Sequence, residues 1–435
     1  MCRISKGWLA YLTVKDKKVH LYIKDLHERY GDIVRIGPNE LSIIPKDTTT
    51  TVIGPKGLPR GPYYNSREHE GGVSLDGIRD PALHAARRKP WARGMNSTAM
   101  KYYEDVIRDE TTTLLRVLRE RKSENTDISE WMSFLRDAAW ISHIPWIIPL
   151  LKYLPSASKS WEDMKVVGAT LVKRRIQDGS THPDLFHYLM DEDGNEPVKP
   201  SLEVCAGDGM LAIIAGSDTA ATTLSHVWYC LLSHPKCFNR LRSEIDEVFP
   251  YGEDPMGNLA KLAILPYLNA CMLSAIHNEA LRLYPPVLGA LQRRIEPETG
   301  GIVIGDHFIP AETQVSLYAY AIHRDPRHFW PIPDQFWPDR WLSQEKYVLP
   351  SGDVIPLDQM VNNREVFVPF SAGPMVCAGK NVAMAEMRAV ISSIVQQFDM
   401  KVEDQCSLSK WEGDIHEVFV TSRGSLPVFL EPRFG

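Results

Sequence analysis

The spacing of apolar and polar residues along the chain indicates a mostly helical protein. The longest apolar helix is predicted to begin at Ser201, which follows Pro200 in the position of an N-cap. It runs to about Leu232, and His234-Pro235 ends it. The other segments with helical periodicity are residues 20–31, 81–122, 157–178, 235–248, 266–284 and 379–398.

Shorter apolar runs predict a small β portion. Residues 32–45 form two such runs around the Gly37-Pro38 turn, which is typical of a hairpin. Residues 287–320 contain further short strand-like runs, and the tail at 415–432 alternates like a final hairpin. Nothing in the pattern divides the chain into independent parts, so we predict a single domain over residues 1–435.

Composition narrows the class of protein. The chain of 435 residues has a formal net charge of −6, which does not favour nucleic-acid binding. Its seven cysteines are odd in number and contain no CxxC pair, which favours a reducing compartment. The apolar patch from Trp8 to Leu12 is too short to span a membrane. We therefore expect a soluble or peripheral chain that lacks an N-terminal membrane anchor.

One cysteine stands in distinctive surroundings. Cys377 lies in the segment FSAGPMVCAG, directly before the last apolar helix. A helix N-terminus stabilises a thiolate, and Gly373 and Gly379 would let the backbone approach a large planar cofactor. The segment alone leaves open the alternative of an ordinary buried cysteine in a glycine-rich turn.

Four ordered segments resemble motifs of the cytochrome P-450 family. The cysteine segment resembles the haem-binding loop FxxGxRxCxG and matches it at Phe370, Gly373, Cys377 and Gly379. It differs at Met375, where the family usually has Arg or His. Three further segments are similar to family motifs: Ala215-Gly-Ser-Asp-Thr219 to the oxygen-binding segment, Glu279-Ala-Leu-Arg282 to ExxR, and Phe336-Trp-Pro-Asp-Arg340-Trp341 to PxRW. The likeness extends from about Asp32 to Pro432 and is greatest to fungal microsomal members.

The resemblance implies a fold, a cofactor and a reaction. The fold is mainly α with a small β region, and the cofactor is haem b with Cys377 as the ligand of its iron. The reaction inserts one oxygen atom from O2 into a lipophilic organic substrate, of the kind met in secondary metabolism. Asp218 and Thr219 would deliver protons, bent around Gly216. Glu279, Arg282 and Arg340 would form a structural network, and the first two share a helix face at i and i+3.

The haem propionates need cations, and Met375 removes one from the usual set. His84 and Arg88 are four residues apart on one helix and could both reach a propionate; His84 stands where the family has Trp. Arg293, after the Pro-Pro turn, is another position similar to the family's. The alternative for Arg88 is membership of a solvated basic patch.

The resemblance also implies partners. Reducing equivalents from NADPH would arrive through an NADPH-cytochrome reductase that docks on the basic face at Arg87, Arg88 and Lys89, unless these only form a charged helix face. A full-length form with an anchor would lie on the cytosolic face of the endoplasmic reticulum membrane. The predicted substrate contacts, each of which could equally be core, are Ile213, Ile214, Val287, Leu288 and Phe419.

The chain departs from the family between residues 120 and 160. One helix is predicted to be missing there, the family's helix E, with the weakly helical segment at 128–143 as an imperfect substitute. The apolar run IPWIIPLLKYLP at 144–155 either touches a membrane surface or is a buried loop. This departure and Met375 leave two alternatives to a monooxygenase. They are a haem-poor, non-catalytic variant or binding protein, and a haem-thiolate isomerase or dehydratase that needs no O2.

Overall fold

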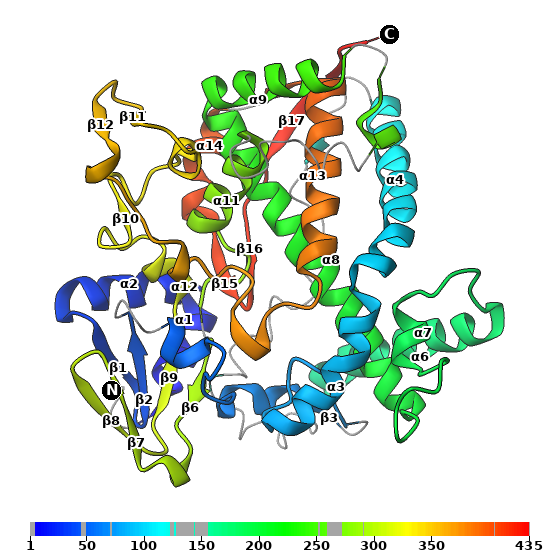
Figure 1. Ribbon diagram of the computed structural model, residues 1–435, viewed down its shortest axis with the longest axis vertical. Coiled ribbons are helices and arrows are strands. Elements are labelled where there is room, and N and C mark those ends of the chain that lie inside the picture. Colours follow the sequence, from blue (N-terminus) through cyan, green and yellow to red (C-terminus); the bar gives the residue numbers. More distant parts are fainter. Residues whose placement is uncertain are drawn as a thin grey trace.

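The computed structural model describes residues 5–44, 49–69, 72–121, 126–127, 143, 155–250, 253–258, 272–289, 291–403 and 405–434. It is mainly helical with small sheets, which confirms the predicted fold class (Figure 1). The predicted loss of a helix falls almost entirely on residues 122–125, 128–142 and 144–154, outside the described residues. The helices are α1 Gly7–Lys15, α2 Val19–Tyr30, α3 Pro81–Gly94, α4 Ser97–Glu120, α6 Pro155–Asp178, α7 Leu185–Leu189, α8 Leu202–Ser233, α9 Pro235–Val248, α11 Met272–Leu283, α12 Ala319–Ile322, α13 Lys380–Gln397 and α14 Gln405–Lys410.

The strands form two larger sheets and five two-stranded ribbons. The first sheet has the order β1-β2-β9-β6, in which β2 and β9 are parallel, and the second has the order β14-β17-β5. The strands are β1 Ile33–Gly37, β2 Glu40–Ile43, β3 Glu68–His69, β4 Gly72–Val73, β5 Thr126–Asp127, β6 Arg293–Arg294, β7 Gly301–Ile304, β8 His307–Pro310, β9 Gln314–Ser316, β10 Phe329–Trp330, β11 Lys346–Val348, β12 Val354–Pro356, β13 Val361–Asn362, β14 Phe398–Val402, β15 His416–Val418, β16 Val420–Ser422 and β17 Pro427–Pro432.

Two predictions about element boundaries were wrong. The helical pattern at 81–122 is two helices, because the side chain of Asn96 accepts hydrogen bonds from the N–H groups of Thr98 and Ala99 and caps a new helix. The tail is not one hairpin: β15 and β16 pair with each other, whereas β17 pairs with β14. Long-range pairing of this kind leaves no trace in the local apolar pattern.

The apolar core has two main parts. The larger cluster lies among α4, α8, α9, α11 and α13, and the second lies between the four-stranded sheet and helices α1 and α2. Figure 1 shows the long α8 passing through the helical part beside α13, with the β1-β2-β9 sheet at the opposite corner. In the middle of α8 the side chain of Ile213 is 43% exposed, and Ala215 and Gly216 are exposed as well. An apolar helix that is exposed in its middle, with a buried C-terminal half, indicates an open space beside it.

Candidate active site

The Cys377 loop ends at the N-terminus of α13. The N–H of Cys377 donates to the carbonyl of Phe370 at 2.9 Å, which closes the loop, and Gly379 is the N-cap residue of α13. Burial raises the pKa of the Cys377 thiol, while the backbone N–H groups of Gly379 and Lys380 and the charge of Arg88 act against that rise. The side chain is nevertheless accessible to solvent. The thiol is therefore reachable from solvent although protein surrounds much of it.

The two glycines of this loop serve different ends. Gly373 has φ of +61°, and a Cβ there would lie 2.2 Å from the carbonyl oxygen of Gly54. Gly373 therefore lets the cysteine loop pack closely against the backbone of Gly54. This corrects the expectation that Gly373 makes room for a cofactor. Gly379 does fit that expectation: a Cβ there would meet no atom within 4 Å, and the same holds for Gly216 on α8.

Asp218 and Thr219 are neighbours on α8, but they lie in different surroundings. The hydroxyl of Thr219 donates to the carbonyl of Ala215 at 2.6 Å, on the half-exposed side of the helix. Asp218 is buried; burial raises the pKa of its carboxyl and the charge of Arg423 opposes the rise. Arg423 also donates to Thr222, one turn further along α8. Residues on both sides of Gly216 belong to one continuous helix, and the bend predicted there stays a prediction.

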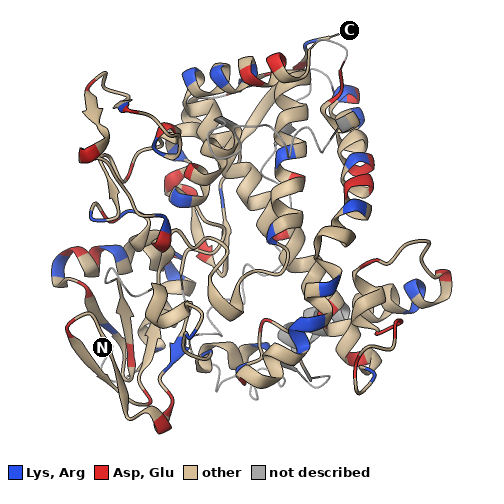
Figure 2. Cartoon of the chain, viewed as in Figure 1, with Lys and Arg blue, Asp and Glu red and all other residues tan. Residues whose placement is uncertain are grey.

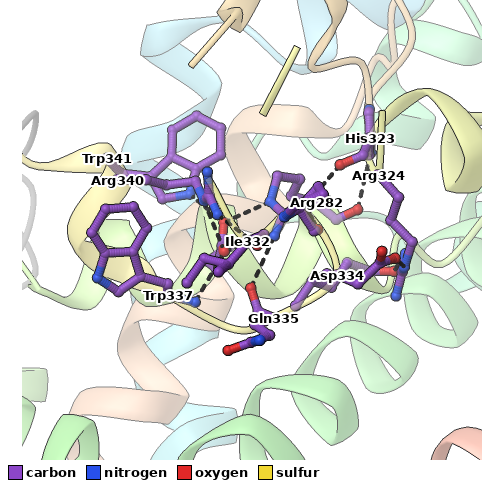
Figure 3. A network of polar contacts seen from close by, with 12 residues as sticks. Arg282, His323, Arg324, Ile332, Asp334, Gln335, Trp337, Arg340 and Trp341 are labelled. Carbon is purple, nitrogen blue, oxygen red and sulfur yellow. Dashed lines mark hydrogen bonds and ion pairs between the residues drawn. The ribbon is translucent and has the colours of Figure 1, made fainter. Parts of the chain in front are cut away.

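Glu279, Arg282 and Arg340 lie together in a fully buried network (Figure 3). Arg282 donates to both carboxylate oxygens of Glu279 at 2.8 Å, and Arg340 donates to one of them at 3.0 Å. Burial would raise the pKa of Glu279, but the two guanidinium groups outweigh it and hold that pKa at about 2. The network therefore keeps a charged carboxylate in the core and fixes α11 to the turn Pro338–Trp341.

Two residues that sequence reasoning missed extend this network. The indole of Trp341 donates to Glu279 at 2.9 Å. The ring of His323 lies 3.2 Å from the carbonyl of Arg282 through Nδ1, and its Nε2 accepts the N–H of Val368 at 3.2 Å. Val368 is two residues before Phe370, so His323 joins the buried network to the start of the Cys377 loop. The Trp that follows Arg340 in the sequence was a usable signal; the isolated His323 carried none.

His84, Arg88 and Arg293 lie close together. Burial, together with the positive charges of Arg60, Arg88 and Arg293, lowers the pKa of His84 to about 4. Arg293 is buried and its Nε has no hydrogen-bond partner. Buried cations of this kind require an anion. Nη1 of Arg293 donates to the carbonyl of Gln292, so Nε is the donor left for an anion. The accessible thiol, the open space at Gly379 and this buried guanidinium together fit a large planar dianion such as haem.

The basic helix face is smaller than the sequence suggests. Lys and Arg residues lie along α3 in Figure 2, but Arg87 turns inward and forms an ion pair of 2.7 Å with the buried Asp208 of α8. Arg88 is half-buried and acts on Cys377. Of the three residues predicted to meet a reductase, Lys89 alone is exposed.

The predicted substrate contacts divide into two groups. Ile213 is exposed on α8, and Ile214 and Val287 are half-buried. Phe419 is also half-buried, with φ of +77°, at the tip of the β15–β16 hairpin, where it packs against Tyr63 and Tyr64 and lies under the Arg67 guanidinium. Leu288 is 1% exposed and packs in the main core, so the alternative of plain core holds for that residue.

Comparison with known proteins agrees with this geometry. The sequence model of the cytochrome P450 family matches residues 137–425. A cytochrome P450 monooxygenase, nodW of Hypoxylon pulicicidum, is 31% identical over 466 residues, covering 98% of this chain and 80% of the relative. Tryprostatin B 6-hydroxylase of Neosartorya fischeri is 29% identical over 469 residues, covering 99% of this chain and 81% of the relative. The chain is an oxidoreductase of the monooxygenase class. It belongs to the cytochrome P450 family.

Among the residues that the structure describes, no helix combines the length and the apolar character that crossing a bilayer demands.

Proposed function

We propose that this chain is a haem-thiolate monooxygenase in which Cys377 is the ligand of the haem iron. The observation that carries the proposal is the accessible Cys377 thiol, which faces the N–H groups of Gly379 and Lys380 and the charge of Arg88. All three favour the thiolate and oppose burial, which raises the pKa of the thiol in the absence of a bound iron. When bound there, haem b supplies the reductive activation of O2 that the reaction needs.

The chain's own residues would hold this group from three sides. Arg88 and Arg293 supply positive charge for the propionates, and His84, on which both charges act, is a neutral ring at pH 7 because its pKa is about 4. Gly379 and Gly216 leave the space that a planar ring system requires. Phe370 closes the loop through its carbonyl, and the Glu279 network with His323 holds the loop's first residues in place.

Proton delivery would fall to Thr219 and Asp218. The Thr219 hydroxyl is held by the Ala215 carbonyl on the half-exposed side of α8, where it can pass a proton to a reacting molecule. Asp218 has a raised pKa and can therefore release a proton nearer to neutral pH than an exposed aspartate. The positive charge of Arg423 favours the carboxylate form and therefore limits the increase in the pKa of Asp218.

The substrate and partners are proposed from the surroundings of the site and from the relatives. Ile213, Ile214, Val287 and Phe419 are apolar or aromatic, which supports a lipophilic substrate. The relatives are fungal enzymes, among them the tryprostatin B 6-hydroxylase, which supports a reaction of secondary metabolism. Electrons would come from NADPH through a separate reductase that meets Lys89. A form with an anchor would work at the endoplasmic reticulum membrane.

The direct test is the reduced carbon monoxide difference spectrum of the purified protein. A strongly red-shifted Soret band is expected, because a thiolate ligand to the haem iron would produce it. Cys377→Ala should abolish the band, whereas Cys406→Ala, which removes another exposed thiol, should keep it. If the unmodified protein gives no such band, the proposal fails and a haem-poor, non-catalytic protein is the remaining interpretation.

A second measurement separates a monooxygenase from a haem-thiolate isomerase or dehydratase. Thr219→Ala removes the hydroxyl and should keep the CO band. In a monooxygenase this substitution should also increase the amount of O2 consumed per molecule of product. The reason is that protons are no longer delivered to the reacting molecule through the Thr219 hydroxyl. Turnover that is independent of O2, and indifferent to this substitution, would identify an isomerase or dehydratase instead.

A further inference from the structure

The β15–β16 hairpin, which presents Phe419 at its tip, is attached to the rest of the molecule through both of its strands. The N–H of Glu417 on β15 donates to the carbonyl of Lys17, just before α2, at 2.7 Å. The N–H of Thr421 on β16 donates to the carbonyl of Pro286 at 2.8 Å. Glu417 and Thr421 are cross-strand partners, and Phe419 lies midway between them in the chain. The position of Phe419 therefore depends on how these two residues are held.

The side chain of Glu417 faces His20 in the first turn of α2. Glu417 is 8% exposed and His20 is 2% exposed, and Oε2 of Glu417 lies 3.7 Å from Nδ1 of His20. Neither atom has a hydrogen-bond partner within the part of the chain that the structure describes. Unpaired buried polar atoms are costly, so two of them side by side point to a bond between them. Their separation exceeds that of a hydrogen bond, and a small rotation of the Glu417 side chain would close it.

Both side chains are mainly uncharged at pH 7. Burial raises the pKa of Glu417 to about 8, and the backbone N–H of His20 acts against that rise. Burial, together with the positive charges of Lys18, Arg324 and His416, lowers the pKa of His20 to about 3. The proton of the pair therefore resides on the carboxyl group, and the contact is not an ion pair. A neutral carboxyl group is a donor, and a neutral imidazole with its proton on Nε2 offers Nδ1 as the acceptor.

Among the described residues, the other groups packed around the pair leave an ionised Glu417 without a counter-charge. The ammonium group of Lys18 donates to two backbone carbonyls in the segment before β15, and Arg324 forms an ion pair of 3.3 Å elsewhere. On the side of the sheet, burial and the charges of Glu417 and Glu40 raise the pKa of Tyr318, which is therefore a neutral phenol. Ionisation of Glu417 would place an uncompensated charge in the interior.

We infer that Glu417 is a positioning residue: as a neutral acid it donates to His20 and thereby holds the β15–β16 hairpin, with Phe419 at its tip, against α2. The contact of Phe419 with substrate rests on the proposed function, whereas the attachment of the hairpin does not. Because the pKa of Glu417 is raised in the attached state, its contribution to the attachment is fully present below pH 4.5, the ordinary value, and is lost as the pH rises to about 8. The substrate side of the site should therefore loosen under mildly alkaline conditions.

The test follows hydrogen exchange of the backbone amides at 415–423 in the purified protein by mass spectrometry. Glu417→Gln keeps a side-chain donor for His20 but cannot ionise. Detachment exposes Glu417, which then loses its proton, so the ratio of exchange rates, original protein to Glu417→Gln, should rise about tenfold per pH unit above pH 6.5. The ratio should level off at about pH 8, where the attached form ionises too. Comparing the two proteins at one pH cancels the intrinsic effect of pH on exchange.

Two further variants serve as controls. Glu417→Leu removes the donor, so the hairpin should exchange faster than in Glu417→Gln at every pH. Glu431→Gln neutralises an exposed acid on β17, and the ratio of exchange rates, original protein to Glu431→Gln, should not change with pH. Circular dichroism establishes that each variant is folded. If Glu417→Leu does not fold, the pH profile of Glu417→Gln decides alone.

A ratio of original protein to Glu417→Gln that stays constant from pH 6.5 upward overturns the inference. Exchange in a folded Glu417→Leu variant that is as slow as in Glu417→Gln overturns it as well, because the donor would then hold nothing. Hydrogen exchange at the hairpin needs no haem. Absence of the CO band would therefore remove the proposed function and the link to substrate, while the exchange profile judges the attachment separately.

Discussion

At the scale of single residues, the buried charge of Glu279 has the largest predicted effect on stability. Glu279→Gln leaves Arg282 and Arg340 buried without a counter-charge, which should cost about 3–5 kcal/mol of unfolding free energy. Urea unfolding of the variant and the original protein measures the difference. Glu298→Gln, at an exposed position, should change the midpoint little, and an equal loss in both variants would contradict a special role for the network.

The same carboxylate sets a pH dependence. Its pKa is about 2 in the folded protein against an ordinary 4.5, so the native state favours the charged form. This stabilisation is fully present above pH 4.5 and is lost as the pH falls toward 2. The stability difference between the original protein and Glu279→Gln should therefore be constant above pH 4.5 and shrink below it. A difference that does not change down to pH 2 would mean that folding does not lower the pKa of this carboxyl group.

The two loop glycines should respond differently to alanine. Gly373→Ala places a Cβ against the Gly54 carbonyl at a positive φ. The loop should then no longer pack closely against Gly54, and the thermal stability of the apoprotein should fall. Gly379→Ala meets no atom, and its φ of −83° suits any residue, so the apoprotein should be unaffected. Only haem uptake should weaken in the second variant. Equal loss of apoprotein stability in both would contradict the separation of roles.

The residues that could be predicted from sequence are those that lie in short motifs. Cys377, Glu279, Arg282 and Arg340 were singled out because their spacing carries chemistry, and the structure brings the last three together. Arg60 and His323 could not be found in this way. Arg60 meets Arg293 across 233 positions of the chain, and the ring of His323 joins Arg282 to Val368. No sequence motif near either residue indicates its contact.

At the scale of elements, the stability of α3 is predicted to depend on its N-cap residue, Asp80. The side chain of Asp80 accepts the N–H of Leu83 at 2.6 Å, at the start of the helix that presents His84 and Arg88. Asp80→Ala should cost about 1 kcal/mol of stability and should also speed haem release. The bond from Val204 to the cap Ser201 of α8 is 3.4 Å, so Ser201→Ala should cost less. Chemical unfolding of both variants gives the comparison, and a larger loss for Ser201→Ala would contradict it.

The extent of the longer elements could be predicted and their partners could not. The pattern placed α2, α8, α9 and α13 to within one or two residues, because each has a continuous apolar face and a clear stop. The break between α3 and α4 was missed because both halves have helical periodicity. The pairing of β17 with β14 was missed because strand partners are chosen by tertiary packing.

At the scale of the whole molecule, the predicted loss of a helix remains a prediction. The alignment with the nodW enzyme extends over 466 residues, more than the 435 of this chain, so that relative has segments without a counterpart here. This supports a deletion without locating it. Limited proteolysis of the haem-loaded protein should cut first between residues 120 and 160. Full resistance of that region would contradict a gap in the helical bundle.

The wide separation along the chain of the residues proposed to hold haem has a consequence for the order in which the molecule is made. Arg88 lies on α3, Arg293 lies on β6, and Cys377 precedes α13. Contacts between such distant segments form late, because loop closure must precede them. A growing chain on the ribosome therefore has no complete receptor for haem until Cys377 has been added to it. Capture of the cofactor should belong to a late stage of maturation, and a shortage of haem should leave a nearly folded protein rather than an arrested one.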